Sequence, residues 1–217
     1  MKTYNPTDYE CASAADARGD AWPFGAHQND GRTAEEPRKG GWIQTYTGGT
    51  FWPMDPQPDD IRIQDIAHSL SMQCRYAGHC IDFYSVAEHS VLLAQWVFEQ
   101  TGSSGMALWG LLHDAAEAYL VDVPRPLKPH LVGYGEAEAR VMKAVRKRFS
   151  MWPFMPEIVR EADTRILVDE REQNMSIGQR KWDIDAEPLG VEIEAWEPSV
   201  AKAAFLEAFD KYGGHHV

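Results

Sequence analysis

The chain has 217 residues, 44% of them apolar and 25% charged, which suits one globular domain with a short appendage. Its 33 acidic and 21 basic side chains give a formal net charge of −12, which disfavours a partner recognised through a phosphate backbone, so no nucleic-acid polymer is expected. A small anionic substrate stays open if the site supplies local positive charge, for example from a metal.

Cysteine usage and the N-terminal residues bear on the compartment. The three cysteines are an odd number without a C-x-x-C pair, so neither a disulfide framework nor a cysteine zinc site is indicated. Residues 1–20 contain no apolar core segment, and the sequence has no run of about 18 uncharged apolar residues. We therefore expect a cytoplasmic protein with no export signal and no membrane partner.

The sequence divides into an irregular arm, residues 1–41, and a body, residues 42–217. The arm is rich in Gly, Asp, Asn, Arg and Ala, and its apolar residues follow neither a helix period nor a strand period. Its aromatic cluster at 22–24 can dock on the body or on a neighbouring subunit. The body opens with Trp, Ile, Tyr, Thr and Phe around Gly48-Gly49, which predicts a short hairpin.

Helical patterning follows the hairpin. Apolar residues between Ile63 and Leu70 share one helical face, in a segment that begins at Asp59 or Asp60. Ser85 and Glu88 are spaced for a capping box, in which each side chain satisfies a free backbone amide of the other residue. A second helix is therefore expected to start at Ser85.

The segment from Gly105 to Leu120 is apolar on nearly all sides, which predicts one buried central helix. Prolines just beyond it prevent its continuation. Three further helices are expected at 134–149, 156–175 and 198–212. Because no strand–helix alternation appears, the fold class is predicted to be mainly α, a helical bundle with a short N-terminal hairpin.

Candidate chemistry lies within the predicted central helix. His113 and Asp114 are adjacent there, where an unpaired ionised carboxylate would be costly. A divalent metal would compensate for it, since imidazole and carboxylate are good ligands for Zn²⁺, Mn²⁺, Fe²⁺ or Co²⁺. His89 and Asp163, each near the apolar stripe of another predicted helix, are the candidates to complete the coordination. The sequence thus predicts a four-residue metal centre spread over three helices.

This order of His, His-Asp and Asp resembles the HD-domain metal-dependent phosphohydrolases, which are named after the adjacent pair. The stretches SVAEHS at 85–90 and LLHDAAEAYLVDVPRPLK at 111–128 are similar to the branch with bacterial 5′-deoxynucleotidases and phage dATP triphosphohydrolases. The resemblance covers residues 42–212 and implies an HD-domain bundle holding a divalent Zn, Mn, Co or Fe ion, with room for a second divalent ion entering with the substrate. It also implies a homo-oligomer, because helical members of the family often assemble.

Carried over residue by residue, the resemblance implies that Glu117 and Asp122 are catalytic, orienting the attacking water or protonating the leaving group. Glu117 also lies one helical turn beyond His113, on the same side. The implied substrate contacts are Arg75 and Lys128 for phosphate, Tyr76 for base or sugar, and Gly78 beside the sugar. Tyr76 keeps an aromatic face where family members often have Trp, whereas Gly78 has no side chain to exclude a ribose 2′-hydroxyl.

The expected function is therefore metal-dependent hydrolysis of the 5′ phosphate or phosphates of a (deoxy)nucleotide, with a small-molecule nucleotide as substrate. Either dNMP yields deoxynucleoside and phosphate, or a dNTP such as dATP yields deoxynucleoside and triphosphate. Two alternatives stay open. HD-type phosphodiesterases and oxygenases use extra histidines before the last aspartate, where only His130 is available. A non-catalytic nucleotide-binding module with a structural metal would need neither Glu117 nor Asp122.

Overall fold

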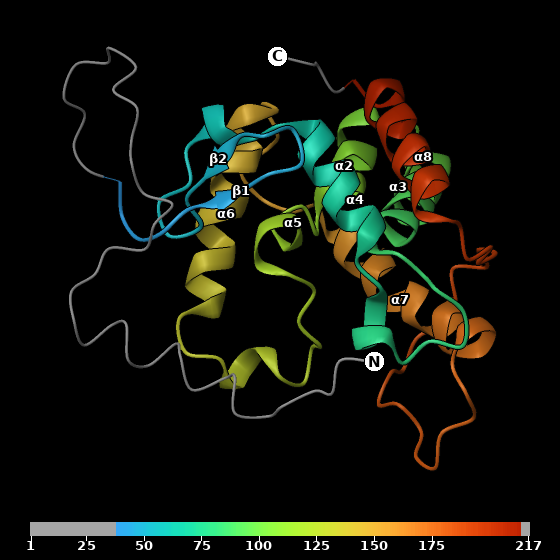
Figure 1. Cartoon of the computed structure of the whole chain (residues 1–217). Helices are drawn as coiled ribbons and strands as arrows, with labels where there is room; N and C mark the ends of the chain where they lie inside the picture. Colours follow the sequence, from blue (N-terminus) through green and yellow to red (C-terminus); the bar gives the residue numbers. More distant parts are fainter. Residues whose placement is uncertain (1–37, 214–217) are drawn as a thin grey trace, which may run out of the picture. The chain divides into compact units, whose positions relative to one another are not determined.

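The computed structural model describes residues 38–213 (Figure 1). The aromatic cluster at 22–24 and residues 1–37 of the predicted arm lie outside this range. An antiparallel pair of strands, β1 (Ile43–Gln44) and β2 (Thr50–Phe51), forms the predicted hairpin. The α-helices that follow are α2 (Ile63–Met72), α3 (Val86–Thr101), α4 (Ser104–Leu112), α5 (Glu117–Leu120), α6 (Tyr134–Arg148), α7 (Glu157–Asn174) and α8 (Pro198–Lys211). The described part of the chain is mainly α-helical, as predicted.

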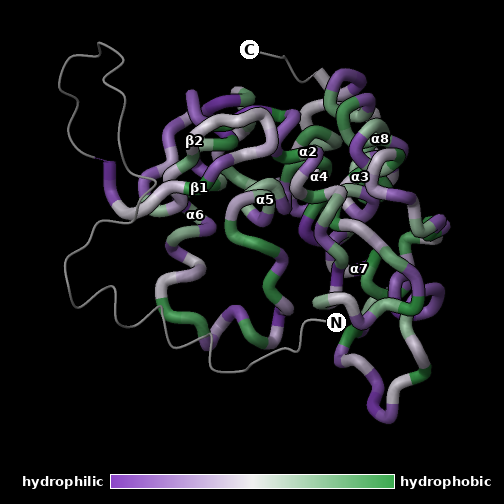
Figure 2. The backbone as a smooth tube through the Cα atoms, in the orientation of Figure 1, coloured by the Kyte–Doolittle hydropathy of each residue, from purple (hydrophilic) through white to green (hydrophobic). Residues whose placement is uncertain are grey.

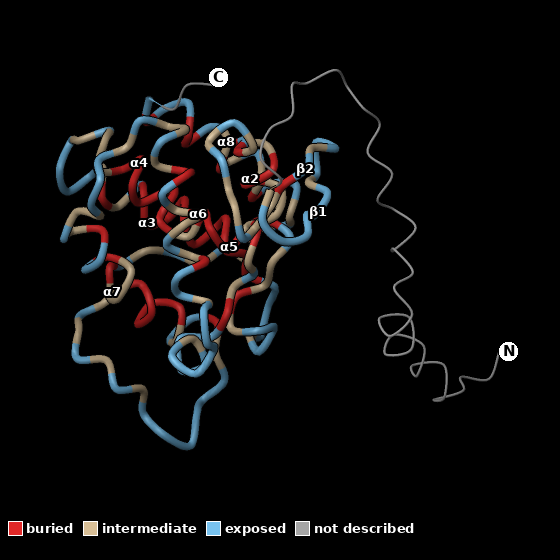
Figure 3. The backbone as a smooth tube through the Cα atoms, turned by 90° about the vertical axis from the view of Figure 1, so that its left-hand side faces the viewer, coloured by how far each residue is buried: buried red, intermediate tan, exposed pale blue. Residues whose placement is uncertain are grey.

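Helix α3 lies at the centre of the packing, in contact with α2, α4, α7 and α8. Figure 3 shows buried residues concentrated on α3, α4 and α5, whereas the loop that follows α7 is largely exposed. The outer helices bury one face: in Figure 2 hydrophilic and hydrophobic residues alternate along α6, whose buried residues recur at helical spacing. Among the helices that the structure describes, none has the length and apolar character needed to cross a membrane.

The prediction of one helix from Gly105 to Leu120 is wrong. Helix α4 ends at Leu112 and α5 begins at Glu117, and the amides of Ala115 and Glu117 are bonded at the tighter i to i−3 spacing. His113 Nδ1 donates to the Gly110 carbonyl at 2.7 Å, the oxygen that a continuing α-helix would offer to the amide of Asp114. The His-Asp pair consequently lies in a tight turn between two helices.

The start of α2 also differs from the prediction. A single 3-10 turn, η3 (Pro58–Asp60), ends at Ile61, and the backbone is extended there and at Arg62. Helix α2 therefore begins at Ile63 rather than at Asp59 or Asp60. The extended backbone allows the Ile61 side chain to be fully buried in the core.

Only half of the predicted capping box forms. The Ser85 hydroxyl accepts from the amide of Glu88 at 3.0 Å, as expected. The Glu88 carboxylate does not return to the helix start; it accepts from the amides of Glu194, Ala195 and Trp196 at 3.0, 3.0 and 2.7 Å. Burial raises the pKa of Glu88, although these amide bonds oppose the shift. This carboxylate satisfies the irregular backbone that leads into α8.

A close approach of α3 and α4 brings the two helices with histidines together. A Cβ at Gly110 would lie 2.9 Å from Leu93 Cδ2 and 3.2 Å from Ala94 Cα, closer than normal packing allows. Glycine at this position therefore sets the separation of the two helix axes. That separation decides how near His89 on α3 can lie to His113.

We predict that Glu88→Ala lowers the free energy of unfolding by about 2–4 kcal/mol, because three partly buried amides lose a charged acceptor. Urea unfolding of the metal-free protein followed by circular dichroism measures the change. The matched control is Glu99→Ala, an exposed glutamate on the same helix, which should change stability by less than about 0.5 kcal/mol. Equal effects of the two substitutions would contradict the anchoring role of Glu88.

Candidate metal centre

Three segments bring the four predicted ligands to one place. Helix α3 carries His89, the turn after α4 carries His113 and Asp114, and α7 carries Asp163. The Nε2 atoms of His89 and His113 are 3.3 Å apart. Asp163 Oδ1 lies 3.6 Å from the His89 Nε2 atom and 3.7 Å from the His113 Nε2 atom. Asp114 Oδ2 is 3.1 Å from His113 Nε2 and 3.7 Å from His89 Nε2. A group of His89, His113 and Asp163 in this arrangement could hold a metal ion.

The hydrogen bonds of the two imidazoles suit metal binding. His89 Nδ1 contacts Glu170 Oε1 at 2.7 Å, and His113 Nδ1 contacts the Gly110 carbonyl at 2.7 Å. Since both contacts are with acceptors, each Nδ1 carries a proton, and in the neutral form of each ring the Nε2 lone pair is turned inward. Tetrahedral bonds of about 2.0–2.1 Å place ligand atoms about 3.4 Å apart, close to the separations found here. The residues present therefore fit a single divalent cation.

Asp114 and Asp163 favour a positive charge at this site even without a metal ion. Burial opposes a charged His113, but Asp114 and Asp163 keep the pKa of His113 well above its usual range. Conversely, the pKa values of Asp114 and Asp163 are held low against burial, chiefly by the histidines. A proton on His113 and a metal cation satisfy the same carboxylates, so the two compete for one position.

Glu170 on α7 contacts the candidate metal centre through His89, and sequence reasoning missed it. It is fully buried, and its Oε1 accepts from His89 while its Oε2 accepts from Arg75 Nη2 at 3.2 Å and from the Tyr76 hydroxyl. Burial opposes its charge, but Arg75 and His89 lower the pKa of Glu170 to about 2. A signal existed: Glu170 lies seven residues after Asp163, on the same apolar helical stripe.

Three predicted substrate residues, Arg75, Tyr76 and Gly78, lie on the short 3-10 segment η4 (Arg75–Gly78). Arg75 is buried, and its Nη1 is 3.7 Å from Asp114 Oδ2. Burial disfavours its charge, yet Glu170 raises the pKa of Arg75, so the guanidinium stays charged. The Tyr76 ring is half-buried and lies 5.5 Å from the ring of Trp182. Gly78 is exposed at the end of the segment, with a left-handed φ of +78°.

The two predicted catalytic carboxyl groups follow the His-Asp turn. Glu117 Oε1 is 3.1 Å from Lys128 Nζ, and Lys128 Nζ also contacts Glu138 at 3.0 Å. Burial, reinforced by the negative charges of Asp114 and Asp122, raises the pKa of Glu117 to about 9. Burial also raises the pKa of Asp122. Lys128, predicted to contact phosphate, thus already donates to two carboxyl groups within the protein.

Arg125 takes a position that its sequence context did not reveal. Its side chain is 63% exposed, and its guanidinium donates to Asp163 Oδ2 at 3.0 Å. This bond orients the Asp163 carboxylate so that Oδ1 faces the histidines. Arg125, at the edge of the candidate metal centre, is consequently more accessible than the buried Arg75.

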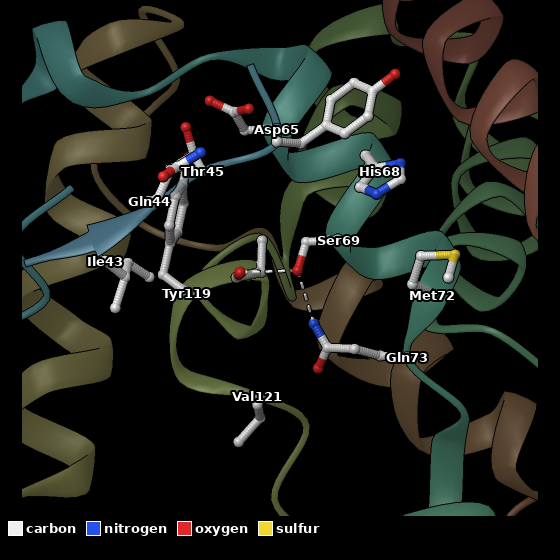
Figure 4. Close-up of a pocket in the computed structure, with 12 residues that line it drawn as sticks. Ile43, Gln44, Thr45, Asp65, His68, Ser69, Met72, Gln73, Tyr119 and Val121 are labelled. Carbon is white, nitrogen blue, oxygen red and sulfur yellow. Dashed lines mark hydrogen bonds between the residues drawn. The ribbon is translucent and has the colours of Figure 1, made fainter. Parts of the chain in front are cut away.

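Gln73 lines a separate cavity of about 620 Å³ beside β1 and α2 and also contacts the segment that carries Glu117 and Asp122 (Figure 4). Its Nε2 donates to Ser69 Oγ at 3.1 Å and to the Glu117 carbonyl at 3.0 Å, and its Oε1 accepts from the amide of Asp122 at 2.9 Å. The amide group of Gln73 is therefore occupied by contacts within the protein. It braces the backbone on which both predicted catalytic carboxyl groups stand.

We predict that His89→Ala abolishes stoichiometric binding of Mn²⁺, Co²⁺ or Zn²⁺, because one inward nitrogen is lost. Elemental analysis after dialysis, together with calorimetric titration, measures the metal content and affinity. His130→Ala is the control, since His130 is exposed and does not belong to the group. Wild-type metal binding by His89→Ala would overturn the assignment.

Comparison with known proteins places this chain in a family. No family model matches the chain. It is 42% identical over 130 residues to the uncharacterized protein YfdR of Escherichia coli (strain K12), across 60% of this chain and 70% of that protein. It is 34% identical over 194 residues to the uncharacterized protein RCAP_rcc00048 of Rhodobacter capsulatus, across 82% of this chain and 96% of that protein. The chain therefore belongs to the same protein family as YfdR and RCAP_rcc00048.

Proposed function

We propose that the protein is a metal-dependent phosphohydrolase that acts on the 5′ phosphate or phosphates of a nucleotide. The observation that carries the proposal is the meeting of four candidate ligand side chains with two guanidinium groups, those of Arg75 and Arg125, at one place. Ligand carboxylates paired with arginines provide a site for an anionic group next to a metal. The resemblance of the surrounding sequence to HD-domain phosphohydrolases supports the same function.

The substrate phosphate would lie against Arg75 and Arg125. Arginine suits this task because its planar group can offer two parallel donors to phosphate oxygens. Tyr76 and Trp182 present neighbouring aromatic rings at the same end of the site, which favours a substrate with a base attached to the phosphate through a sugar. With no side chain at Gly78, discrimination against ribose has to come from other residues, and the proposal therefore covers both ribo- and deoxynucleotides.

The reaction is the addition of water to phosphorus with loss of the nucleoside oxygen and transfer of a proton to it. A divalent cation supplies the Lewis acidity that activates water and polarises a phosphoryl oxygen. Glu117, whose pKa lies above neutrality, can hold a proton at pH 7 and release it to the leaving oxygen. Lys128 occupies Oε1 of Glu117, so Oε2, which lacks a hydrogen-bond partner within residues 38–213, is the oxygen left to carry that proton.

A substrate panel tests the proposed reaction. Metal-loaded protein is offered dNMP, dNTP, NMP and NTP with Mn²⁺, Co²⁺, Zn²⁺ or Mg²⁺, while orthophosphate, pyrophosphate and triphosphate are detected separately. We expect orthophosphate from monophosphates or triphosphate from triphosphates, and His89→Ala should release neither. Binding of nucleotides without any phosphate product would contradict the hydrolase and favour a nucleotide-binding module with a structural metal.

We predict that Glu117→Gln lowers kcat about 10²- to 10⁴-fold, because the amide cannot transfer the proton, while bound metal stays at the wild-type level. Steady-state kinetics on the best substrate of the panel and elemental analysis provide the two measurements. Glu138→Gln is the matched control, since Glu138 contacts the same lysine. An equal loss of kcat in both variants would assign the effect to Lys128 instead.

A further inference from the structure

We infer that Glu170 is a positioning residue that couples occupancy of the metal centre to the conformation of η4, the segment that carries Arg75 and Tyr76. One carboxylate oxygen of Glu170 contacts the metal-ligand candidate His89, and the other contacts both η4 side chains. Glu170 is fully buried, so no solvent competes for these bonds. The inference requires the metal centre but is independent of the proposed hydrolase activity.

The η4 segment needs such support, because its backbone is strained. Tyr76 and Ala77 have φ of 56° and 53°, left-handed values that are unfavourable for residues with a Cβ, and Gly78 follows with φ of 78°. Strained backbone of this kind persists only where the surroundings hold it in place. The bonds from Arg75 and Tyr76 to Glu170 secure the start of the segment, and the amide of His79 closes its end on the Tyr76 carbonyl at 3.1 Å.

The charges give the coupling its direction. Arg75 stands between two carboxylates, with Nη2 3.2 Å from Glu170 Oε2 and Nη1 3.7 Å from Asp114 Oδ2. When a cation neutralises Asp114, that carboxylate no longer competes with Glu170 for the guanidinium. His89 with a cation at Nε2 also becomes a stronger donor from Nδ1 to the same carboxylate. Metal binding is therefore expected to tighten the contacts that hold η4.

The test compares Glu170→Gln with the control Glu172→Gln, an exposed position on α7 whose carboxylate pairs with Arg171. Mn²⁺ affinity is measured by calorimetry, and hydrogen exchange of the peptide spanning residues 74–82 is measured with and without Mn²⁺. In the wild type and in Glu172→Gln, Mn²⁺ should slow this exchange. In Glu170→Gln, affinity should fall about 10- to 100-fold, and the slowing should be lost even at saturating Mn²⁺.

A second variant keeps the test decisive if Glu170→Gln folds poorly. Tyr76→Phe removes one donor to Glu170 and leaves the His89 contact intact, so Mn²⁺ affinity should stay near the wild-type value while the metal-dependent slowing shrinks. A purely structural Glu170 would lower the unfolding midpoint without changing Mn²⁺ affinity or the exchange response of the folded protein. That result, or an undiminished exchange response in Tyr76→Phe, would overturn the inference. Neither measurement involves turnover, so failure of the hydrolase proposal would be seen separately.

Discussion

Two imidazole lone pairs and two carboxylates that meet in a largely buried place require positive charge among them. Without it, like charges and unpaired acceptors would face one another away from water, at a high cost in free energy. Several features of the surrounding structure bring these four side chains together. Gly110 allows α3 and α4 to approach closely, and the tight turn after α4 directs His113 and Asp114 to one side. Helix α7, later in the sequence, adds Asp163.

The net charge of −12 describes the chain as a whole but not this site. Arg75 and Arg125 each lie against a candidate ligand carboxylate, and Lys128 lies against Glu117. With a divalent cation added, the local field would favour anions even though the protein surface repels them. The expected exclusion of nucleic-acid polymers and the proposed acceptance of a small phosphate ester are therefore compatible, because an extended polyanion meets the whole surface whereas a small ligand meets only the site.

Sequence patterning was reliable where an interaction is local. The hairpin around Gly48-Gly49, the helices at 134–148 and 157–174, and the serine cap at Ser85 all depend on near neighbours in the chain. Patterning failed where a distant partner competes. The carboxylate of Glu88 bonds to amides more than a hundred residues away instead of its own helix start, and the predicted central helix breaks where His113 takes a backbone carbonyl.

The sequence by itself determined the mainly helical class and named the four candidate ligands, because residue type and helical spacing reveal which polar groups must lie near an apolar face. Only the tertiary structure decided which other charges join them. Glu170 looks like an ordinary helical carboxylate, and Arg125 like surface charge, until folding places one behind His89 and the other against Asp163. Contacts between side chains on different helices depend on how the helices cross, and no local pattern encodes that geometry.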